Sequence, residues 1–324
     1  MTRRALMALV LARSSARAKA VRHLLAAQSD DGGWKSETYG LLRRGESLTP
    51  LVLTALLESG ETVPRAAVDR AVAFVRARID KEGALGRSDP FAVDYPNYAT
   101  SLGVHALIRA GADGWRPMLA YLRGQQFTEA NGWTRDDACY GGWGVGGDVR
   151  RPPHPGHVDL SMTRYALEAF QAAGAAASDP ALGKAAVFVN RLRNSDGGYC
   201  FSTVVEDANK AGSGVSYGSA TCDAWRALRI VGAPADSARG WLLRRHRADS
   251  VAGFESHPDK RWTRGLFFYY AAGYPFPDKG LAARLADEQR SDGSWRNSEP
   301  LVKEDDPLIA TALALRALSQ GQAL

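Results

Sequence analysis

Residues 28–34 read Gln-Ser-Asp-Asp-Gly-Gly-Trp, a glycine turn that ends on an aromatic residue. Related turns are Asn-Ser-Asp-Gly-Gly-Tyr at 194–199 and Gln-Arg-Ser-Asp-Gly-Ser-Trp at 289–295, with looser versions at 80–83, 126–133 and 253–254. An Asp-Gly pair permits the positive φ of a tight turn, and the aromatic side chain can anchor the turn on neighbouring helices. A turn that recurs along the whole chain indicates a repeat architecture.

A second repeated pattern follows these turns, a small-residue-rich segment that begins near Thr and closes on Gly. Its copies are Thr49–Gly60, Thr100–Gly111, Thr163–Gly174, Thr221–Gly232, Trp262–Gly273 and Thr311–Gly321. Apolar residues recur in these segments at i, i+3, i+4 and i+7, which is helical spacing. The closing glycine suits the left-handed position that ends a helix. Each segment therefore predicts one helix.

Each of these helices is preceded by another that runs into a glycine turn, which gives six helix pairs at a period of about 50 residues. One pair cannot bury its apolar faces alone, so neighbouring pairs must stack. Six pairs with their long loops at one end favour closure into a double ring. We predict an all-α fold, a single (α/α)6 toroid of six inner and six outer helices, over residues 14–324, with an N-terminal extension or extra helix at 1–13. The Thr-started helices are the more apolar set and should form the inner ring.

The glycine turns of the QxxDGGW type resemble the QW repeats of squalene and oxidosqualene cyclases. The stretches Tyr140-Gly-Gly-Trp-Gly144 and Val158-Asp-Leu-Ser-Met-Thr-Arg-Tyr-Ala-Leu-Glu168 are especially similar to that family. On these residues the chain resembles the isoprenoid cyclase and protein prenyltransferase superfamily. The resemblance extends from about residue 14 to the end of the chain. It implies a toroid whose apolar lumen binds a terpenoid or polyprenyl chain and cyclises or isomerises it by acid catalysis. The site would lie at the N-terminal ends of the inner helices.

Squalene-type cyclases protonate an alkene with an aspartic acid from a D-x-D-D-T-A motif, directly before an inner-helix Thr. None of the corresponding pairs of positions is acidic here. The nearest analogue is Glu304-Asp305-Asp306, before Thr311, so Asp305 and Asp306 are candidate acids. Asp306 followed by Pro307 also fits a helix N-cap, which is the alternative interpretation. Asp159 is a third candidate, and it too suits an N-cap.

Aromatic residues on or near the inner helices could stabilise carbocations in the lumen, although they also suit an ordinary core. The substrate-binding candidates among them are Tyr98, Tyr165, Tyr217, Trp225, Trp262 and Phe268. Arg164 and Arg264 could hold a diphosphate. Arg164 could instead form a helix salt pair with Glu168, four residues on.

Protein prenyltransferases bind zinc through an Asp-x-Cys pair and a His at inner-helix starts. Asp137-Ala-Cys139 imitates the first part but lies well before Thr163, and His154 and His157 sit in a Pro-rich loop. We therefore predict no cofactor and no zinc site. Mg²⁺ would accompany the substrate only if that substrate were a diphosphate.

Two other functions stay open. The toroid could be a non-catalytic module that binds a lipid or a protein. It could also be a carbohydrate-active hydrolase or lyase, which would need two carboxylates across a cleft. Loop acids available for such a pair are Asp136, Asp137, Glu206, Asp207, Asp305 and Asp306.

Composition limits the partners. Of the 324 residues, 45% are hydrophobic and 23% charged, the net charge is +6, and no basic run points to nucleic acid. The apolar stretch at 5–12 is short for a signal peptide and Arg13 follows it, so we expect a cytoplasmic protein with at most peripheral membrane contact. Because cyclases of this superfamily usually pair two barrels, a partner chain or homodimer could complete the site.

Overall fold

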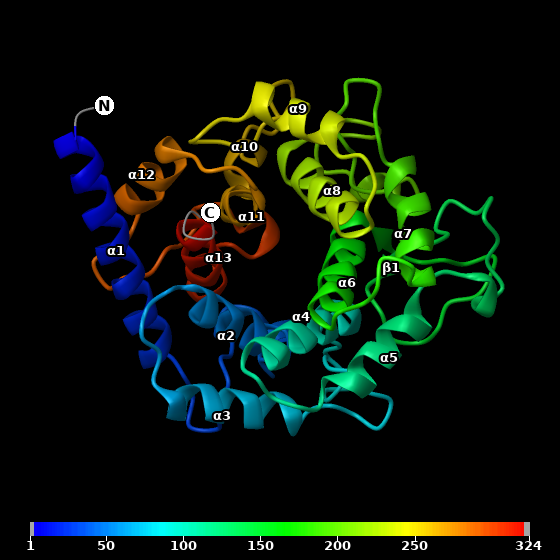
Figure 1. Ribbon diagram of the computed structural model, residues 1–324, viewed down its shortest axis with the longest axis horizontal. Coiled ribbons are helices and arrows are strands. Elements are labelled where there is room, and N and C mark those ends of the chain that lie inside the picture. The colour runs from blue at the N-terminus through cyan, green and yellow to red at the C-terminus, as the bar shows by residue number, and fades with distance from the viewer. Residues whose placement is uncertain (1–2, 321–324) are drawn as a thin grey trace.

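The chain forms two concentric rings of helices (Figure 1). The structure, a computed structural model, describes the backbone of residues 3–320 and the side chains of residues 15–320. The inner ring comprises α2 (Leu48–Glu58), α4 (Pro96–Arg109), α6 (Leu160–Ala172), α8 (Gly218–Ile230), α10 (Trp262–Gly265) with α11 (Phe267–Gly273), and α13 (Pro307–Ser319). The outer ring comprises α1 (Arg3–Ala26), α3 (Arg65–Arg76), α5 (Trp115–Gln125), α7 (Pro180–Arg191), α9 (Asp236–Arg245) and α12 (Lys279–Asp287).

The inner helices contact one another in sequence order, and α13 packs against α2, so the inner ring is closed. Two short strands, β1 (Trp143–Gly144) and β2 (Val158–Asp159), pair antiparallel beside α6. The (α/α)6 toroid predicted from the repeats is confirmed. The division between residues 1–13 and the toroid remains a prediction.

The repeated Thr residues fasten the glycine turns to the inner helices. In five repeats the Thr hydroxyl oxygen accepts a hydrogen bond from a backbone N–H just after the turn. These bonds join Trp34 to Thr49 (2.9 Å), Leu85 to Thr100 (2.9 Å), Trp143 to Thr163 (3.1 Å), Tyr199 to Thr221 (3.1 Å) and Trp295 to Thr311 (3.0 Å). Since donor and acceptor are buried, each bond satisfies a group that would otherwise be costly to bury.

The Gln and Trp of a turn tie it to the outer ring. The Trp295 indole N–H donates to the Leu285 carbonyl (2.7 Å), and the Gln289 amide donates to the carbonyls of Gly293 (2.9 Å) and Ala16 (2.8 Å). Ala16 belongs to α1, so the last turn of the chain is bonded to the first helix. Gly293 has a φ of +88°, and a Cβ at this position would lie 2.5 Å from a backbone oxygen of α1. Only glycine permits this approach.

The fifth inner helix differs from expectation. The sequence predicts one helix over 262–273, but Leu266 (φ −126°, ψ 23°) separates α10 from α11. The freed N–H groups of Phe268 and Tyr269 at the start of α11 donate to the Glu304 carboxylate (3.1 and 2.7 Å). A carboxylate from a distant loop therefore replaces the helix hydrogen bonds lost at the break.

Candidate functional site

A cavity of about 890 Å³ occupies the inner ring at the N-terminal ends of its helices. This volume falls within the range of roughly 300–1,000 Å³ that is typical of small-molecule sites. Its wall combines residues near the starts of the inner helices, such as Leu51, Met162 and Ile309, with residues of the loops that lead into the helices, such as Tyr95 and Phe201. The lining is mostly apolar, as expected for a toroid lumen.

Four of the predicted substrate-binding aromatics line the cavity: Tyr98, Tyr165, Tyr217 and Trp262. Tyr98 and Tyr165 meet edge to face, with ring centroids 4.7 Å apart. Tyr217 is buried, and its hydroxyl has no hydrogen-bond partner within the described residues. Tyr269, an inner-helix aromatic outside the predicted substrate-binding set, also lines the cavity.

The other four predicted contact residues lie outside the lining, which corrects the expectation for them. Trp225 packs edge to face on Phe276, with centroids 5.5 Å apart. Arg264 extends outward to Glu288 (2.7 Å), and Phe268 is buried among its neighbours in the wall. Arg164 is likewise buried, and its guanidinium forms ion pairs with Glu168 and Asp223 below the cavity. Helical spacing placed these residues on inner helices but did not fix which face they occupy.

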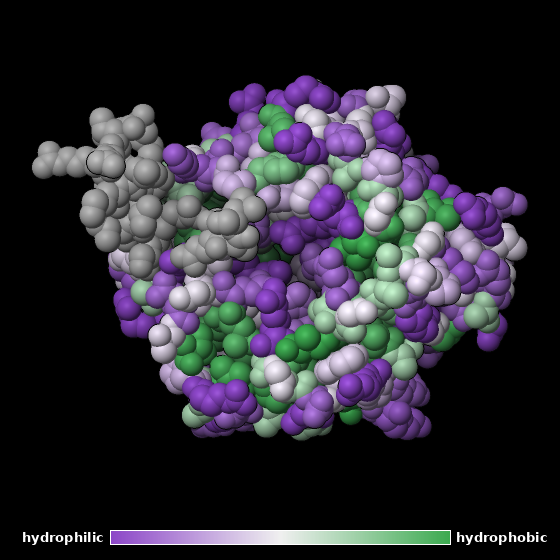
Figure 2. All heavy atoms as spheres, viewed as in Figure 1, coloured by the Kyte–Doolittle hydropathy of each residue, from purple (hydrophilic) through white to green (hydrophobic). Residues whose placement is uncertain are grey.

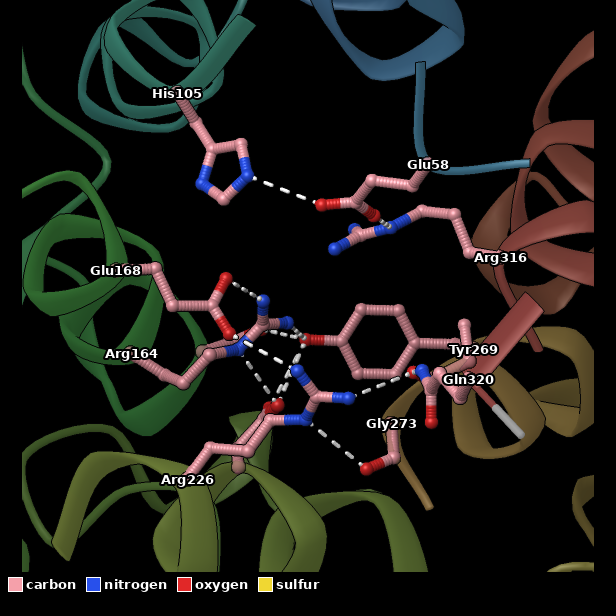
Figure 3. A network of polar contacts seen from close by, with 12 residues as sticks. Glu58, His105, Arg164, Glu168, Arg226, Tyr269, Gly273, Arg316 and Gln320 are labelled. Carbon is pink, nitrogen blue, oxygen red and sulfur yellow. Dashed lines mark hydrogen bonds and ion pairs between the residues drawn. The ribbon is translucent and has the colours of Figure 1, made fainter. Parts of the chain in front are cut away.

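A network of polar groups closes the inner ring beneath the cavity (Figure 3). Arg164 binds Glu168 (2.8 Å) and Asp223 (3.0 Å), and it donates to the Tyr269 hydroxyl (2.6 Å). The pairing of Arg164 with Glu168 was one of the two interpretations of the sequence. Further contacts join Glu58 to His105 (3.2 Å), Glu58 to Arg316 (3.1 Å), and Arg226 to Glu168 (3.4 Å). Hydrophilic residues accordingly gather around the centre of the ring in Figure 2.

The three predicted acids, Asp159, Asp305 and Asp306, lie in three different surroundings. Asp159 lines the cavity, caps α6 by accepting from Met162 N (2.8 Å), and pairs with His157 (2.8 Å). Asp306 caps α13 by accepting from the backbone N–H of Leu308 (2.9 Å), and it is absent from the lining. Asp305 accepts from the Tyr39 hydroxyl and borders a shallow surface hollow instead. The capping interpretation thus describes Asp306, and neither Asp305 nor Asp306 reaches the lumen.

Glu304, the first residue of the same acidic run, lines the cavity. It is 1% exposed, and one carboxylate oxygen accepts from Tyr269 N (2.7 Å) while the other accepts from Phe268 N (3.1 Å) and Asn297 Nδ2 (2.8 Å). Burial raises the pKa of Glu304 to about 7, although the hydrogen bonds from Tyr269, Asn297 and Phe268 oppose this shift. The Glu304 carboxyl therefore keeps its proton to a higher pH than an ordinary glutamate does.

Two further buried acids were missed in the sequence. Burial raises the pKa of Asp223, with Arg164 opposing, and Asp223 lines the cavity. Burial also raises the pKa of Asp94 to about 6, and its carboxylate accepts from the N–H (2.9 Å) and hydroxyl (2.8 Å) of Ser47 at the start of α2. Asp94 stands six residues before Thr100. A search wider than the two positions before each Thr would have found it.

The described residues contain no group of three or more His, Cys, Asp or Glu side chains arranged to hold a metal ion. Asp137 and Cys139 lie apart from the cavity lining, and burial raises the pKa of the Cys139 thiol to about 12. Between residues 3 and 320, no helix has both the length and the apolar character needed to cross a membrane.

Comparison with solved structures identifies the architecture. A variant of the type II terpene cyclase MstE from Scytonema, bound to geranylgeranyl dihydroxybenzoate, matches with a TM-score of 0.65 at 14% identity, over 97% of this chain and 98% of that one. Protein geranylgeranyltransferase-I from Candida albicans matches with a TM-score of 0.54 at 15% identity, over 91% and 86%. The chain has the isoprenoid cyclase and prenyltransferase fold.

This terpene cyclase-like fold is not confined to isoprenoid enzymes. A glycosidase matches with a TM-score of 0.54 at 15% identity, over 99% of both chains. No protein-family model matches the sequence, and no curated protein does. At these identities the likeness concerns the terpene cyclase-like fold alone, and any activity must be argued from the cavity.

Proposed function

We propose that the protein binds an isoprenoid chain in its lumen and cyclises or isomerises it by acid catalysis, with Glu304 as the proton donor. One observation carries the proposal: a buried carboxyl with a pKa near 7 lines a largely apolar cavity walled by aromatic rings. The binding of an isoprenoid substrate by the structural neighbour MstE supports the same substrate class.

The surroundings of Glu304 suit an acid that must donate to a weak base such as an alkene. Burial keeps the proton on the carboxyl near neutral pH. The N–H groups of Phe268 and Tyr269 already point at the carboxylate oxygens, so the anion left after proton transfer meets preorganised donors. Burial therefore retains the proton before the reaction, and the two N–H groups stabilise the carboxylate afterwards. The site does not need to rearrange between the two states.

The reaction balances without an external oxidant or reductant. The Glu304 proton forms a new C–H bond with one alkene carbon, using the π electrons, and leaves a cation on the other carbon. A second double bond of the same chain attacks that cation and closes a ring. Loss of a proton from the final cation to the Glu304 carboxylate restores the acid, so the product is an isomer of the substrate. The rings of Tyr98 and Trp262 can stabilise the intermediate cations, whereas the Arg164 guanidinium already lies 3.4 Å from the centroid of the Tyr165 ring.

The loop acids give the carbohydrate-active alternative little support. Of the six considered for a carboxylate pair, only Asp207 lines the lumen. The other carboxylates of the lining, Asp159, Asp223 and Glu304, are held by His157, by Arg164 and by backbone N–H groups respectively. Asp305 borders a separate hollow, and Asp137 hydrogen-bonds the exposed Thr134. Glycoside hydrolysis needs two carboxyl groups flanking one bond. The cofactor-free reaction proposed here needs a single acid, and Mg²⁺ enters only with a diphosphate substrate.

Incubation of the purified protein with squalene, geranylgeraniol and geranylgeranyl diphosphate in D₂O, followed by mass spectrometry, tests the proposal. The product should be an isomer that carries one solvent deuteron at the carbon protonated first. Glu304→Gln keeps the shape of the side chain and should lower turnover by about 100-fold or more, the usual contribution of a general acid. Asp305→Asn, the neighbouring acid outside the cavity, is the matched control and should stay within a few-fold of wild type.

Three outcomes would contradict the proposal. Full activity of Glu304→Gln would remove Glu304 as the acid. A product without deuterium would exclude alkene protonation. Tight binding of all three compounds without turnover would identify the toroid as a lipid-binding module. Whether a homodimer or partner chain completes the site remains a prediction, which the sedimentation of the purified protein would test.

A further inference from the structure

The two oxygens of the Glu304 carboxyl receive different numbers of hydrogen bonds. Oε1 accepts from one donor, the backbone N–H of Tyr269 (2.7 Å), whereas Oε2 accepts from two, the backbone N–H of Phe268 (3.1 Å) and the side-chain amide of Asn297 (2.8 Å). A carboxyl oxygen has two lone pairs and therefore accepts two hydrogen bonds. Oε2 is full, and among the contacts of the described residues one position on Oε1 stays vacant.

This difference decides which oxygen carries the proton when Glu304 is neutral. A proton on Oε2 would displace one of its two donors and leave a buried N–H without an acceptor, which is costly. A proton on Oε1 displaces no donor. The neutral acid therefore has Oε1 as its hydroxyl oxygen and Oε2 as its carbonyl oxygen, and the carbonyl keeps both of its hydrogen bonds.

Asn297 is the side chain that makes the two oxygens unequal. It is 6% exposed, its Nδ2 also donates to the carbonyl of Arg264 (2.8 Å), and its Oδ1 accepts from the N–H of Glu299 (3.0 Å). Both ends of the amide are matched to their partners, so a flipped amide would turn its oxygen toward two other acceptors. Without Asn297, each oxygen of Glu304 would have one backbone donor, and neither oxygen would be preferred by the proton.

We infer that Asn297 is a positioning residue for the acid: together with the N–H of Phe268 it occupies Oε2 of Glu304 and so keeps the transferable proton on Oε1. The inference rests on the proposed function, in which Glu304 is the proton donor, and it adds the atom from which the proton leaves. In the transfer the Oε1–H bond breaks and its electron pair stays on the carboxylate, while the proton forms the new C–H bond with the alkene π electrons. Asn297 is absent from the cavity lining, so it acts through Glu304 and not on the ligand.

The titratable side chains on the elements around Glu304 bind other partners. They pair Arg264 with Glu288, the Tyr269 hydroxyl with Asp223, Lys303 with the Tyr95 hydroxyl, Asp305 with the Tyr39 hydroxyl, and Asp306 with Leu308 N. Lys303 also interacts with the buried Asp94 carboxylate. Burial raises the pKa of Glu304, and the positive charge of Arg264 opposes this shift together with the three hydrogen bonds. Replacing Asn297 leaves all of these charges in place, so a change at Glu304 reports the lost hydrogen bond.

Infrared difference spectroscopy of the ligand-free protein tests the inference. The spectrum of each protein minus that of the same protein with Glu304→Gln isolates the C=O band of the protonated Glu304 carboxyl, which disappears as the pH rises through the pKa. In Asn297→Leu the midpoint of this titration should rise by about 1–2 pH units, because the carboxylate loses a hydrogen bond. The C=O band should also move to higher frequency, because the carbonyl oxygen Oε2 loses one of its two donors.

Two further variants and a control accompany Asn297→Leu. Asn297→Ala removes the same amide without the bulk of Leu and should give the same two changes. Asn297→Gln keeps an amide donor and should reduce both changes. Asn209→Leu is the matched control, because Asn209 is also a buried loop asparagine (7% exposed) but its amide bonds backbone groups of residues 201, 202 and 206. It should leave the midpoint and the frequency of the Glu304 band unchanged.

Two results would overturn the inference. One is a titration midpoint that stays the same in Asn297→Leu and Asn297→Ala. The other is a midpoint that rises while the C=O band keeps its frequency, because the carbonyl oxygen would then be Oε1 and the proton would lie on Oε2. Neither measurement needs turnover. Failure of the wild-type protein to convert any isoprenoid would overturn the proposed function, whereas the infrared result alone decides where the proton lies.

Discussion

Replacing Glu304 by Gln should change how the stability of the protein depends on pH. In the folded state burial raises the pKa of this carboxyl to about 7, whereas its ordinary value is 4.5. Below pH 4.5 both the folded and the unfolded chain hold the proton. Between pH 4.5 and 7 only the folded chain holds it, so the contribution of Glu304 to stability falls as the pH rises.

The size of the effect follows from the two pKa values. One pKa unit corresponds to 1.36 kcal/mol, so a shift from 4.5 to about 7 amounts to about 3 kcal/mol. Gln resembles the protonated acid in shape and does not ionise. The free energy of unfolding of Glu304→Gln minus that of wild type should therefore increase by about 3 kcal/mol between pH 4 and pH 8, with most of the change between pH 4.5 and 7.

Urea unfolding followed by circular dichroism, measured at several pH values for both proteins, provides this difference. Glu206→Gln is the matched control, because Glu206 is exposed on a loop and its side chain is solvated in both states. A difference for Glu304→Gln that stays constant from pH 4 to pH 8 would refute the reasoning. It would mean that the three N–H donors outweigh burial and that the folded protein holds no proton on Glu304 at neutral pH.

Other predictions concern the groups that hold the rings together. Thr311→Val should lower the free energy of unfolding by about 1–3 kcal/mol, because it leaves the buried N–H of Trp295 without an acceptor. Thr311→Ser keeps the hydroxyl and should lower the free energy of unfolding less. Equal losses in the two variants would contradict the role of the Thr311 hydroxyl as an acceptor. Arg164→Met should cost about 3–5 kcal/mol, because it leaves Asp223 buried without its cation. Adding Asp223→Asn to Arg164→Met should restore part of that loss in urea unfolding, and a strictly additive double variant would show that the two residues are not coupled.

The ring architecture could be predicted from the sequence because each repeat carries its own local signals. Thr311, Gly293 and Trp295 each have a role that depends on residue type, as a hydroxyl acceptor, a positive φ and an indole donor. These roles recur in several turns, so the pattern stands out from the background. The break at Leu266 could not be predicted, because it depends on a carboxylate that lies 38 residues further along the chain, at position 304.

The candidate acid shows where sequence reasoning stops. The sequence predicts Glu304-Asp305-Asp306 as the relevant acidic segment. Its three side chains bond different partners: Glu304 accepts from Tyr269 N, Asp305 from the Tyr39 hydroxyl and Asp306 from Leu308 N. Lys303 adopts a positive φ just before the run, which sets the direction of the chain there. Asp306 matches a local capping pattern, whereas the position of Glu304 depends on α11, an element remote in sequence. Spacing alone therefore pointed to the neighbours of the residue that lines the lumen.

The bond between Gln289 and the Ala16 carbonyl joins residues 273 positions apart. Ribosomes add roughly 5–20 residues per second, so α1 waits at least about 14 s after it is made before this partner exists. Until then the inner ring is an open crescent, and the faces of α2 and α1 that α13 covers are exposed to the cell. Chaperone dependence of the nascent chain should therefore persist until α13 has left the ribosome. A chain stalled before residue 300 should stay sensitive to proteases that the finished ring resists.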